Sequence, residues 1–385
     1  MSVEVSRYQK NIGSIHTHTS FSGMRFSPRQ TAELALRSGL KVLIFTDYSD
    51  RKWKYYLNIG FERSSILSKG IENYISMTKE IGNQFKELTV LDGVEASPFY
   101  YWEGNPFWLT CRNYNRHLLV FGLQSQADYW DLPLLANDKS GFNPFLGDQG
   151  IAPYQKLIDY ANQKEALTFW AHPEQEDNTK FFTARLYTPA RPEVLNETYD
   201  YTGFSSFPRG HKIIPQPGGI WDQILLEYCD GKRNKPVWTI GESDFRKEID
   251  DIANPTTVFV APVNDRRDVL SSLKEGRFYA LNSPDKDLFL DQFCVIDKEK
   301  SRFASMGQTI HCSSGEATVH VDIKSKYKFK KVILIKNGSI IKEVKENYFE
   351  YVDRSYPDRR KTFYRLIVES VNGSMLLANP IFVTN

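Results

Sequence analysis

The sequence predicts an α/β protein in which a mostly parallel sheet or barrel is followed by a small all-β domain, most simply a sandwich. Two observations lead to this prediction. Between about residues 12 and 260, helical patterns alternate with continuous apolar runs, which is typical of βα units. From about residue 305, several stretches show period-two alternation of apolar and polar residues, which is typical of half-buried strands. The chain of 385 residues is long enough to bury a core in each part.

The first helix carries start and stop signals in "SPRQTAELALRSGLKVLIFTD", residues 27–47. Ser27 suits the N-cap, Pro28 suits the first helical position, and Gly39 suits the end of the helix. "KVLIFTD", residues 41–47, then predicts a buried strand, because a continuous apolar run ends in polar residues.

The same order of patterns recurs along the first 260 residues. A helical pattern at 71–86 leads to a strand in 88–97, a further strand is predicted in 115–123, and helix–strand pairs are predicted in 154–175 and 221–244. Residues 124–150 and 178–220 break the order and are predicted to be insertions, since they are long and rich in Gly, Pro, Asn and aromatic residues. The second insertion is a candidate lid, in which Arg209 and His211 of "FPRGHK" are candidate substrate-binding residues.

The C-terminal part shows three period-two segments, in residues 316–325, 330–344 and 362–384. Asn337-Gly338 and Asn372-Gly373 are strong hairpin signals. We therefore predict a barrel-like domain over residues 1–265, a connecting segment over 266–304 and a β-sandwich over 305–385.

Composition narrows the class of protein and its partners. The formal net charge is +2 and no basic block stands out, so nucleic acid is not expected as a partner beyond a nucleotide substrate. The four cysteines form no CxxC and are expected to be free thiols in a reducing compartment. Because no apolar run approaches membrane-spanning length and the N-terminus has no apolar core, we expect a cytoplasmic protein without a membrane partner.

The stretch "SIHTHTSFSG", residues 14–23, holds two of the seven histidines of the chain, one residue apart. In a strand, His16 and His18 would point to the same face, so both rings could reach one metal ion. Further polar residues stand at the carboxyl ends of predicted strands, or in the case of His117 just inside its strand, where the active sites of α/β barrels are built. These residues are Asp47, Glu95, His117, His172 and Asp244. Taken together, four histidines and two carboxylates form a ligand set for two metal ions.

The ordered motifs HTH, TD, GVE, RHLL, AHP and ESD resemble those of the PHP (polymerase and histidinol phosphatase) superfamily of metal-dependent hydrolases. The resemblance covers about residues 12–250 and implies a distorted (β/α)₇ TIM-like barrel. The later stretch "DVLSSLKEGRFYALNSPDKDLFLD", residues 268–291, is similar to the carbaryl-hydrolase-like branch of that superfamily.

The resemblance implies two divalent transition metal ions (Zn, Mn or Fe). One ion would be held by His16, His18, Glu95 and Asp244, and the other by Glu95, His117 and His172. A third ion found in many PHP enzymes lacks its usual ligands here, because the corresponding residues are Gly23, Tyr48 and Arg246.

The expected activity is hydrolysis by a water that two metal ions activate, with a phosphoester of a small, anionic molecule or a nucleotide as the favoured substrate. The catalytic candidates are Asp47, which would orient a histidine, together with Tyr48 and Arg246. Arg246, Arg25 and Lys180 could bind substrate oxygens, and solvated surface charge is the alternative for Arg25 and Lys180. The alternatives in function are an ester, amide or carbamate hydrolase and a non-enzymatic protein that binds metal or glycan.

Overall fold

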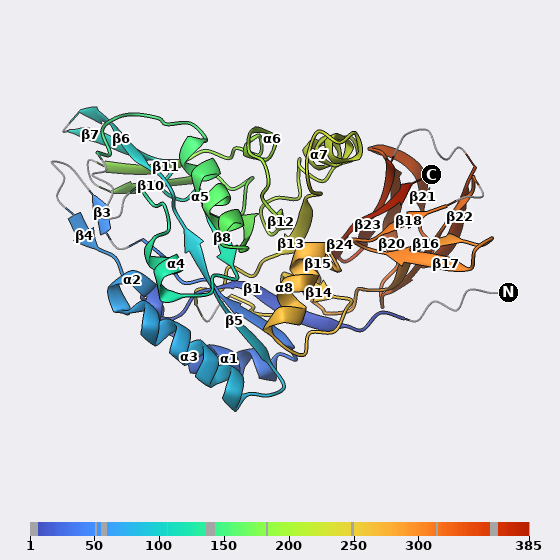
Figure 1. Cartoon of the computed structure of the whole chain (residues 1–385), viewed down its shortest axis with the longest axis horizontal. Coiled ribbons are helices and arrows are strands. Elements are labelled where there is room, and N and C mark those ends of the chain that lie inside the picture. Colours follow the sequence, from blue (N-terminus) through green and yellow to red (C-terminus); the bar gives the residue numbers. More distant parts are fainter. Residues whose placement is uncertain are drawn as a thin grey trace.

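The computed structural model describes residues 7–50, 52–54, 60–105, 107–135, 143–181, 184–247, 250–312, 315–354 and 361–384. Within these ranges the fold is a mixed α/β structure with an additional antiparallel C-terminal sheet (Figure 1). The C-terminal sheets lie at one end of the molecule, and a small sheet of long hairpins lies at the other.

One large sheet runs through the molecule. Its N-terminal part contains, in spatial order, β13 (Trp238–Gly241), β12 (Gly203–Phe207), β9 (Leu167–Trp170), β8 (Leu118–Phe121), β5 (Thr89–Ala96), β2 (Val42–Phe45), β1 (Asn11–Thr17), β14 (Thr256–Phe259) and β15 (Phe278–Asn282). Neighbours from β13 to β1 pair in parallel, except that β8 is antiparallel to both β5 and β9. An isolated parallel bridge also joins Thr17 to Phe245, shortly after β13. The closed (β/α)₇ barrel remains a prediction.

The same sheet continues into the C-terminal part through the antiparallel pair β15 and β24. Its further strands are β24 (Met375–Thr384), β23 (Lys361–Ser370), β20 (Phe329–Lys336), β21 (Ser339–Val344) and β18 (Thr309–His311). A second layer contains β17 (Arg302–Ser305), β16 (Phe289–Asp297), β19 (Ala317–Lys324) and β22 (Tyr348–Asp353). The two antiparallel layers share a buried core that includes Val295, Val321, Leu334 and Leu366.

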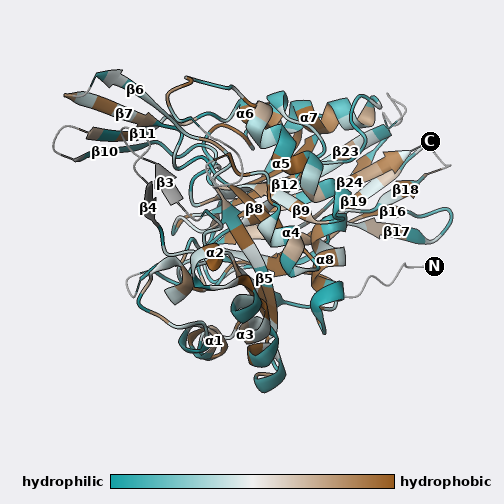
Figure 2. Cartoon of the chain, turned by 60° about the vertical axis from the view of Figure 1, so that its left-hand side comes forward, coloured by the Kyte–Doolittle hydropathy of each residue, from teal (hydrophilic) through white to brown (hydrophobic). Residues whose placement is uncertain are grey.

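The helices and the smaller sheets surround the central strands. The helices are α1 (Pro28–Arg37), α2 (Ile66–Lys69), α3 (Ile71–Gln84), α4 (Gln126–Trp130), α5 (Ala152–Gln163), α6 (Val194–Glu197), α7 (Ile220–Cys229), α8 (Arg266–Glu275) and the 3₁₀ turn η1 (Ser20–Ser22). The sheet of hairpins contains β10 (Asp177–Phe181), β11 (Ala184–Thr188), β7 (Trp108–Arg112) and β6 (Tyr101–Asn105), and β3 (Lys52–Lys54) pairs with β4 (Gly60–Glu62). Helices α1 and α3 carry both hydrophilic and hydrophobic residues, as expected for helices that cover a sheet (Figure 2).

The local signals explain several of these elements. Ser27 caps α1 by accepting a hydrogen bond from the backbone of Gln30, and the Gln30 side chain accepts one from the backbone of Ser27 in return. Gly39 follows this helix with a φ of 78°, as a helix-ending glycine does. Asn337 and Gly338, with φ values of 49° and 84°, form the tight turn between β20 and β21.

The structure differs from the sequence prediction in the two long segments. Residues 178–220 contain β11, α6 and β12, and β12 belongs to the central sheet. Its sequence "GFSSF" has no continuous apolar run, so it lacks the signal of a buried strand. Residues 124–150 contain α4, and their residues 136–142 lie outside the described ranges.

The N-terminal and C-terminal parts are joined by more than one connection. Strands on both sides of residue 305 share one sheet, since β15 pairs with β24. The buried Asn379 of β24 accepts a hydrogen bond from the backbone of Thr239 and donates one to the carbonyl of Phe278. The domain limits of residues 1–265, 266–304 and 305–385 remain predictions. The N-terminal and C-terminal parts share a sheet and hydrogen bonds in addition to the chain that connects them.

Two further expectations concern the cysteines and the membrane. Cys111, Cys229, Cys294 and Cys312 are all buried free thiols, as predicted. Across the described ranges, every helix is too short or too polar to cross a bilayer.

Candidate metal centre

The six predicted metal ligands lie at one rim of the central sheet. His16 belongs to β1 and His18 follows it, Glu95 belongs to β5, His117 precedes β8, His172 follows β9, and Asp244 follows β13. The position of His117 corrects a prediction, because the sequence placed it with residues at the carboxyl ends of strands. It stands at the amino end of β8, and because β8 runs antiparallel to β5 and β9, that end lies at the same rim as their carboxyl ends.

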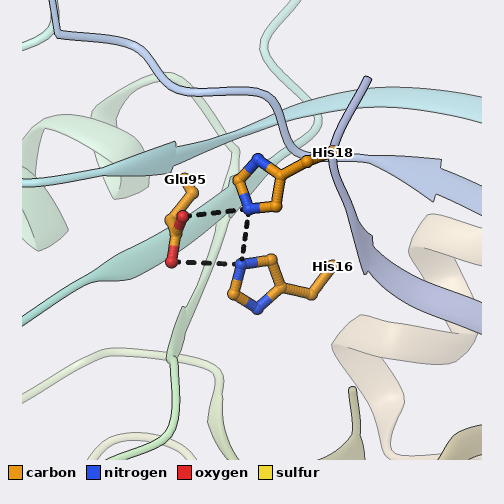
Figure 3. Close-up of side chains that lie close together, drawn as sticks. All are labelled: His16, His18 and Glu95. Carbon is orange, nitrogen blue, oxygen red and sulfur yellow. Dashed lines mark hydrogen bonds and ion pairs between the residues drawn. The ribbon is translucent and has the colours of Figure 1, made fainter. Parts of the chain in front are cut away.

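Glu95 lies at the centre of this group and is completely buried. Its Oε1 lies 3.0 Å from His16 Nε2 and 2.5 Å from His117 Nδ1, and its Oε2 lies 3.1 Å from His18 Nε2. His172 Nε2 lies 3.4 Å from Oε1. The two Nε2 atoms of His16 and His18 are 3.2 Å apart (Figure 3). One carboxylate thus meets four imidazole rings.

The backbone is strained at three of these positions. His16, His172 and Asp244 have φ values of 70°, 32° and 43°, in the left-handed region that residues with a Cβ rarely adopt. The pairing of β1 with β2 shifts register between Ser14 and Thr17, so His16 sits in a bulge rather than in regular alternation with His18. Such conformations cost about 1–3 kcal/mol each and gather at functional sites.

The outer nitrogens of two histidines are held by acceptors. His16 Nδ1 lies 2.9 Å from Glu242 Oε2 and donates to it. His18 Nδ1 lies 3.1 Å from Ser22 Oγ, and Ser22 Oγ in turn donates to Asp47 Oδ1 at 2.6 Å. The Ser22 hydroxyl has used its proton on Asp47, so it accepts from His18. Asp47 therefore acts on His18 through Ser22, consistent with the orienting role predicted for it.

In His117 the two ring nitrogens have the opposite roles, since Nε2 is held by an acceptor and Nδ1 faces Glu95. Its Nε2 lies 3.1 Å from the carbonyl oxygen of Tyr114, which can only accept, so Nε2 carries the proton. Its Nδ1 is buried, lacks a hydrogen-bond partner in the described part of the chain, and faces Glu95. A bare nitrogen lone pair so close to a carboxylate oxygen needs positive charge between them. Nitrogens of His16, His18 and His117 converge on this one carboxylate, so the residues fit a divalent cation.

The pKa values of the histidines report how strongly the site attracts positive charge. Burial would lower the pKa of His16, but the carboxylates of Glu95, Asp244 and Glu242 outweigh burial and raise this pKa well above its usual value. Burial lowers the pKa of His18 to about 3, so this ring is neutral and can ligate a metal.

The pKa values of the carboxylates shift in the opposite direction. Burial would raise the pKa of Glu95, but His117, His16 and Arg246 outweigh it and hold this pKa well below its usual value. The pKa of Asp244 is lowered to about 2, because His16 and Arg246 outweigh the effect of its burial. Both carboxylates are ionised at neutral pH and available to a cation.

Arg246 extends into this cluster from the segment after β13. Its Nε donates to Asp244 Oδ1 at 2.6 Å, its Nη2 lies 3.4 Å from Glu95 Oε2, and its Nη1 donates to the Tyr48 hydroxyl. Burial raises the pKa of Tyr48 to about 12, so this phenol stays protonated. Of the three residues that correspond to third-metal ligands, Arg246 and Tyr48 thus contact each other, and Gly23 follows η1 as an exposed turn residue.

A polar cavity of about 510 Å³ opens onto the cluster. The residues that line it include His117, His172, Asp244 and Arg246 of the cluster, together with Arg209, Lys247, Asp177 and Asp251. Three of the predicted substrate-binding residues do not line this cavity, as far as the described residues show. Arg25 and Lys180 are exposed elsewhere, and the ring of His211 packs on Phe207. Of the four, only Arg209 lies at the cavity.

Glu242 belongs to the site but was not among the residues predicted from the sequence. Its two oxygens bond His16 Nδ1 and the backbone N–H of His172, so one buried carboxylate fixes two of the histidines. The signal was present in the sequence, since Glu242 belongs to the same "GESD" as Asp244 and follows the same strand. Three overlapping groups of potential ligands result: His16, His18 and Glu95; His16, His172 and Glu242; and Glu95, His117 and His172.

We expect Glu242→Gln to lower metal affinity by about 10–100-fold, the usual cost of removing a residue that orients a ligand. Glutamine keeps the size of the side chain but loses the charge that fixes the tautomer of His16. Isothermal titration of the metal-free protein with Mn²⁺ or Zn²⁺ measures the effect. Unchanged affinity would show that Glu242 does not control the ligand geometry.

Comparisons with known proteins add structural neighbours. No family model and no curated protein matches the sequence. A two-domain protein from Bacteroides vulgatus, described as containing a predicted PHP-like metal-dependent phosphoesterase, matches at 13% identity and a TM-score of 0.44, over 98% of this chain and 96% of its own. A protein from Bifidobacterium adolescentis, described as a proposed metal-dependent phosphoesterase, matches at 13% identity and a TM-score of 0.33, over 62% of this chain and 90% of its own.

A third structure is that of an amidohydrolase from Chromobacterium violaceum, with bound sulfate and no metal. It matches at 12% identity and a TM-score of 0.35, over 69% of this chain and 96% of its own. The structural neighbours of this chain are therefore PHP-like metal-dependent phosphoesterases and an amidohydrolase, and the chain itself carries buried His/Glu groups that fit a metal.

Proposed function

We propose that the protein is a metal-dependent hydrolase, most simply a phosphoesterase that acts on a small phosphorylated molecule or a nucleotide. The observation that carries the proposal is the convergence of three imidazole nitrogens on the Glu95 carboxylate, beside a polar cavity that His117 lines. A buried carboxylate surrounded by imidazole rings needs positive charge beside it, and a divalent cation would supply that charge.

The residues would be divided between two ions, with Glu95 as a ligand of both. His16, His18, Glu95 and Asp244 would hold one ion, and Glu95, His117 and His172 would hold the other. Divalent ions bound there would lower the pKa of water from 15.7 towards about 7 and polarise the scissile phosphoryl or carbonyl group.

Arg246 has the geometry of a substrate-binding residue. Asp244, Tyr48 and Glu95 fix its guanidinium at the cavity wall. These contacts use only part of its five N–H donors, so the rest can bind anionic oxygens of a substrate. Arg209 and Lys247 also line the cavity and add positive charge to it. This distribution favours a phosphorylated substrate.

A second candidate is an ester, amide or carbamate hydrolase. Asp177 and Asp251 also line the cavity, and their carboxylates would repel a highly charged anion. The same metal site would then act on a neutral substrate.

A panel of substrates separates these functions. The metal-free protein and protein supplied with Mn²⁺ or Zn²⁺ would be assayed on a phosphomonoester, a phosphodiester, an aryl ester and a carbamate. Metal-dependent turnover of a phosphoester supports the first proposal, and turnover of only the ester or carbamate supports the second. A protein that binds metal but hydrolyses none of the four would contradict both.

We expect Arg246→Ala to reduce kcat/KM by about 10-fold or more on phosphoesters and by much less on the neutral carbamate, because a charge-assisted hydrogen bond contributes about 1.5–3 kcal/mol. Arg246→Lys keeps the charge without the planar fork and should recover part of the loss. Equal losses on both classes of substrate would mean that Arg246 supports the metal site rather than the substrate.

We expect close to two equivalents of transition metal per chain rather than three. At about 4 Å and an effective dielectric of about 20, repulsion between Arg246 and a divalent ion would be of order 8 kcal/mol. The Tyr48 phenol is protonated and accepts from Arg246, so it offers little in return. Elemental analysis of purified protein tests this count, and three equivalents per chain would contradict it.

A further inference from the structure

A second hollow, of about 810 Å³, lies on the C-terminal sandwich, and none of its lining residues belongs to the metal centre. The ends of β16, β19 and β20 and the turn at residues 345–347 line it, together with Lys10. Its cations are five lysines: Lys10, Lys324, Lys326, Lys328 and Lys345. Three of them come from "KSKYKFKK", residues 324–331, a basic stretch that corrects the expectation of a chain without basic blocks.

The lysines of this basic groove differ in how their charge is balanced. Lys10 and Lys324 both pair with Asp291, at 2.9 and 3.2 Å. Lys326, Lys328 and Lys345 are exposed and form no ion pair within the described ranges. By contrast, Lys330 and Lys331 of the same stretch point to Glu369. The groove therefore has three lysines that form no ion pair among the described residues.

The carboxylates that line the groove do not offset these charges fully. Asp287 accepts hydrogen bonds from Ser283, Ser325 and Ser374. Glu346 lies beside Lys345 and accepts from the backbone N–H of that residue. Five lysines against Asp287, Glu346 and the paired Asp291 still leave a positively charged concave surface, which is complementary to an anionic chain.

The aromatic residues of the groove argue against single-stranded nucleic acid. Phe329 is buried, and Lys10 Nζ lies 4.8 Å above the ring of Phe289. Tyr327 is the one lining aromatic that is largely exposed, at 40%. Successive bases need several open rings to stack on, and the lining residues include no arginine for bidentate contacts. One exposed tyrosine ring surrounded by lysine ammonium groups suits a sugar chain that carries carboxylate or sulfate groups.

We propose that the basic groove binds an acidic polysaccharide, with the lysines contacting its anionic groups and Tyr327 stacking on one sugar ring. This proposal does not depend on the hydrolase function of the N-terminal part. It gives the C-terminal sandwich a recognition function of its own.

Binding of dextran sulfate to the full chain, with neutral dextran of the same length as the reference polymer, tests the proposal at low ionic strength. We expect saturable binding of dextran sulfate alone, weakened as salt rises, since the contacts are electrostatic. The triple variant K326Q/K328Q/K345Q should bind at least about tenfold more weakly and with a smaller salt dependence. Tyr327→Ala should weaken binding without changing the salt dependence.

The matched control is K41Q/K79Q/K156Q, which removes the same charge from three exposed lysines of the N-terminal part. It should bind dextran sulfate like the wild type. Equal weakening in both triple variants would show that only net charge matters and would overturn the proposal. A single-stranded oligonucleotide that binds more tightly than dextran sulfate and displaces it would also overturn it, in favour of nucleic acid.

Discussion

Glu95→Ala is expected to abolish hydrolysis and to lower metal affinity by more than about 100-fold, beyond the loss that follows from removing an orienting residue. Glu95 is the one residue that contacts His16, His18, His117 and His172 among the described parts of the chain. Its removal takes a ligand from both proposed ions at once and also removes the negative charge that offsets their repulsion.

The loss should occur in a folded protein. The carboxylate is buried beside rings that donate hydrogen bonds to Glu242, Ser22 and the Tyr114 carbonyl, and these bonds hold the rings independently of Glu95. Metal analysis, circular dichroism and activity would be measured on Glu95→Ala and on Glu95→Gln, which keeps the size of the side chain. Glu369→Ala, at an ion pair on the C-terminal part, is the control for the same chemical change. Full metal content in Glu95→Ala would contradict the bridging role.

Asp222→Asn is expected to destabilise the whole protein by about 3–5 kcal/mol, the usual cost of leaving one partner of a buried ion pair uncompensated. Asp222 of α7 and Arg365 of β23 are both completely buried, with N–O distances of 2.5 and 2.7 Å. Arg365 also lies over the ring of Trp221, with its Cζ 4.9 Å from the centroid. The pair joins the N-terminal part to the C-terminal sheet, so its loss should affect both.

Denaturant unfolding of Asp222→Asn measures this effect. The exposed pair of Lys298 and Glu350 is the control, and Glu350→Gln should change the free energy of unfolding by about 1 kcal/mol or less. Replacing both buried partners, as in Asp222→Leu with Arg365→Met, should recover much of the loss, since no buried charge then remains unpaired. A change below about 1 kcal/mol in Asp222→Asn would mean that water or a local rearrangement compensates Arg365.

The sequence by itself determined the elements that carry strong local signals and most of the candidate site. The cap of α1, the turn at Asn337-Gly338 and the buried strands β2, β5 and β9 follow from local signals, because capping, turn geometry and apolar periodicity act over a few residues. The six predicted ligands meet at one rim because each stands at or near the end of a strand, and the strand ends are fixed by the same local patterns.

The tertiary structure alone decided how those residues are used. Because β8 is antiparallel to its neighbours, His117 reaches the rim from the amino end of its strand. Whether two strands pair in parallel or antiparallel is not encoded in either strand alone. Glu242 became an orienting residue only when its two oxygens met His16 and His172, which lie 226 and 70 residues away in the sequence. Lys180 and His211 failed to reach the cavity because β10 and the segment after β12 direct them elsewhere. Long-range contacts of this kind depend on how strands pair and bend, so no local pattern could specify them.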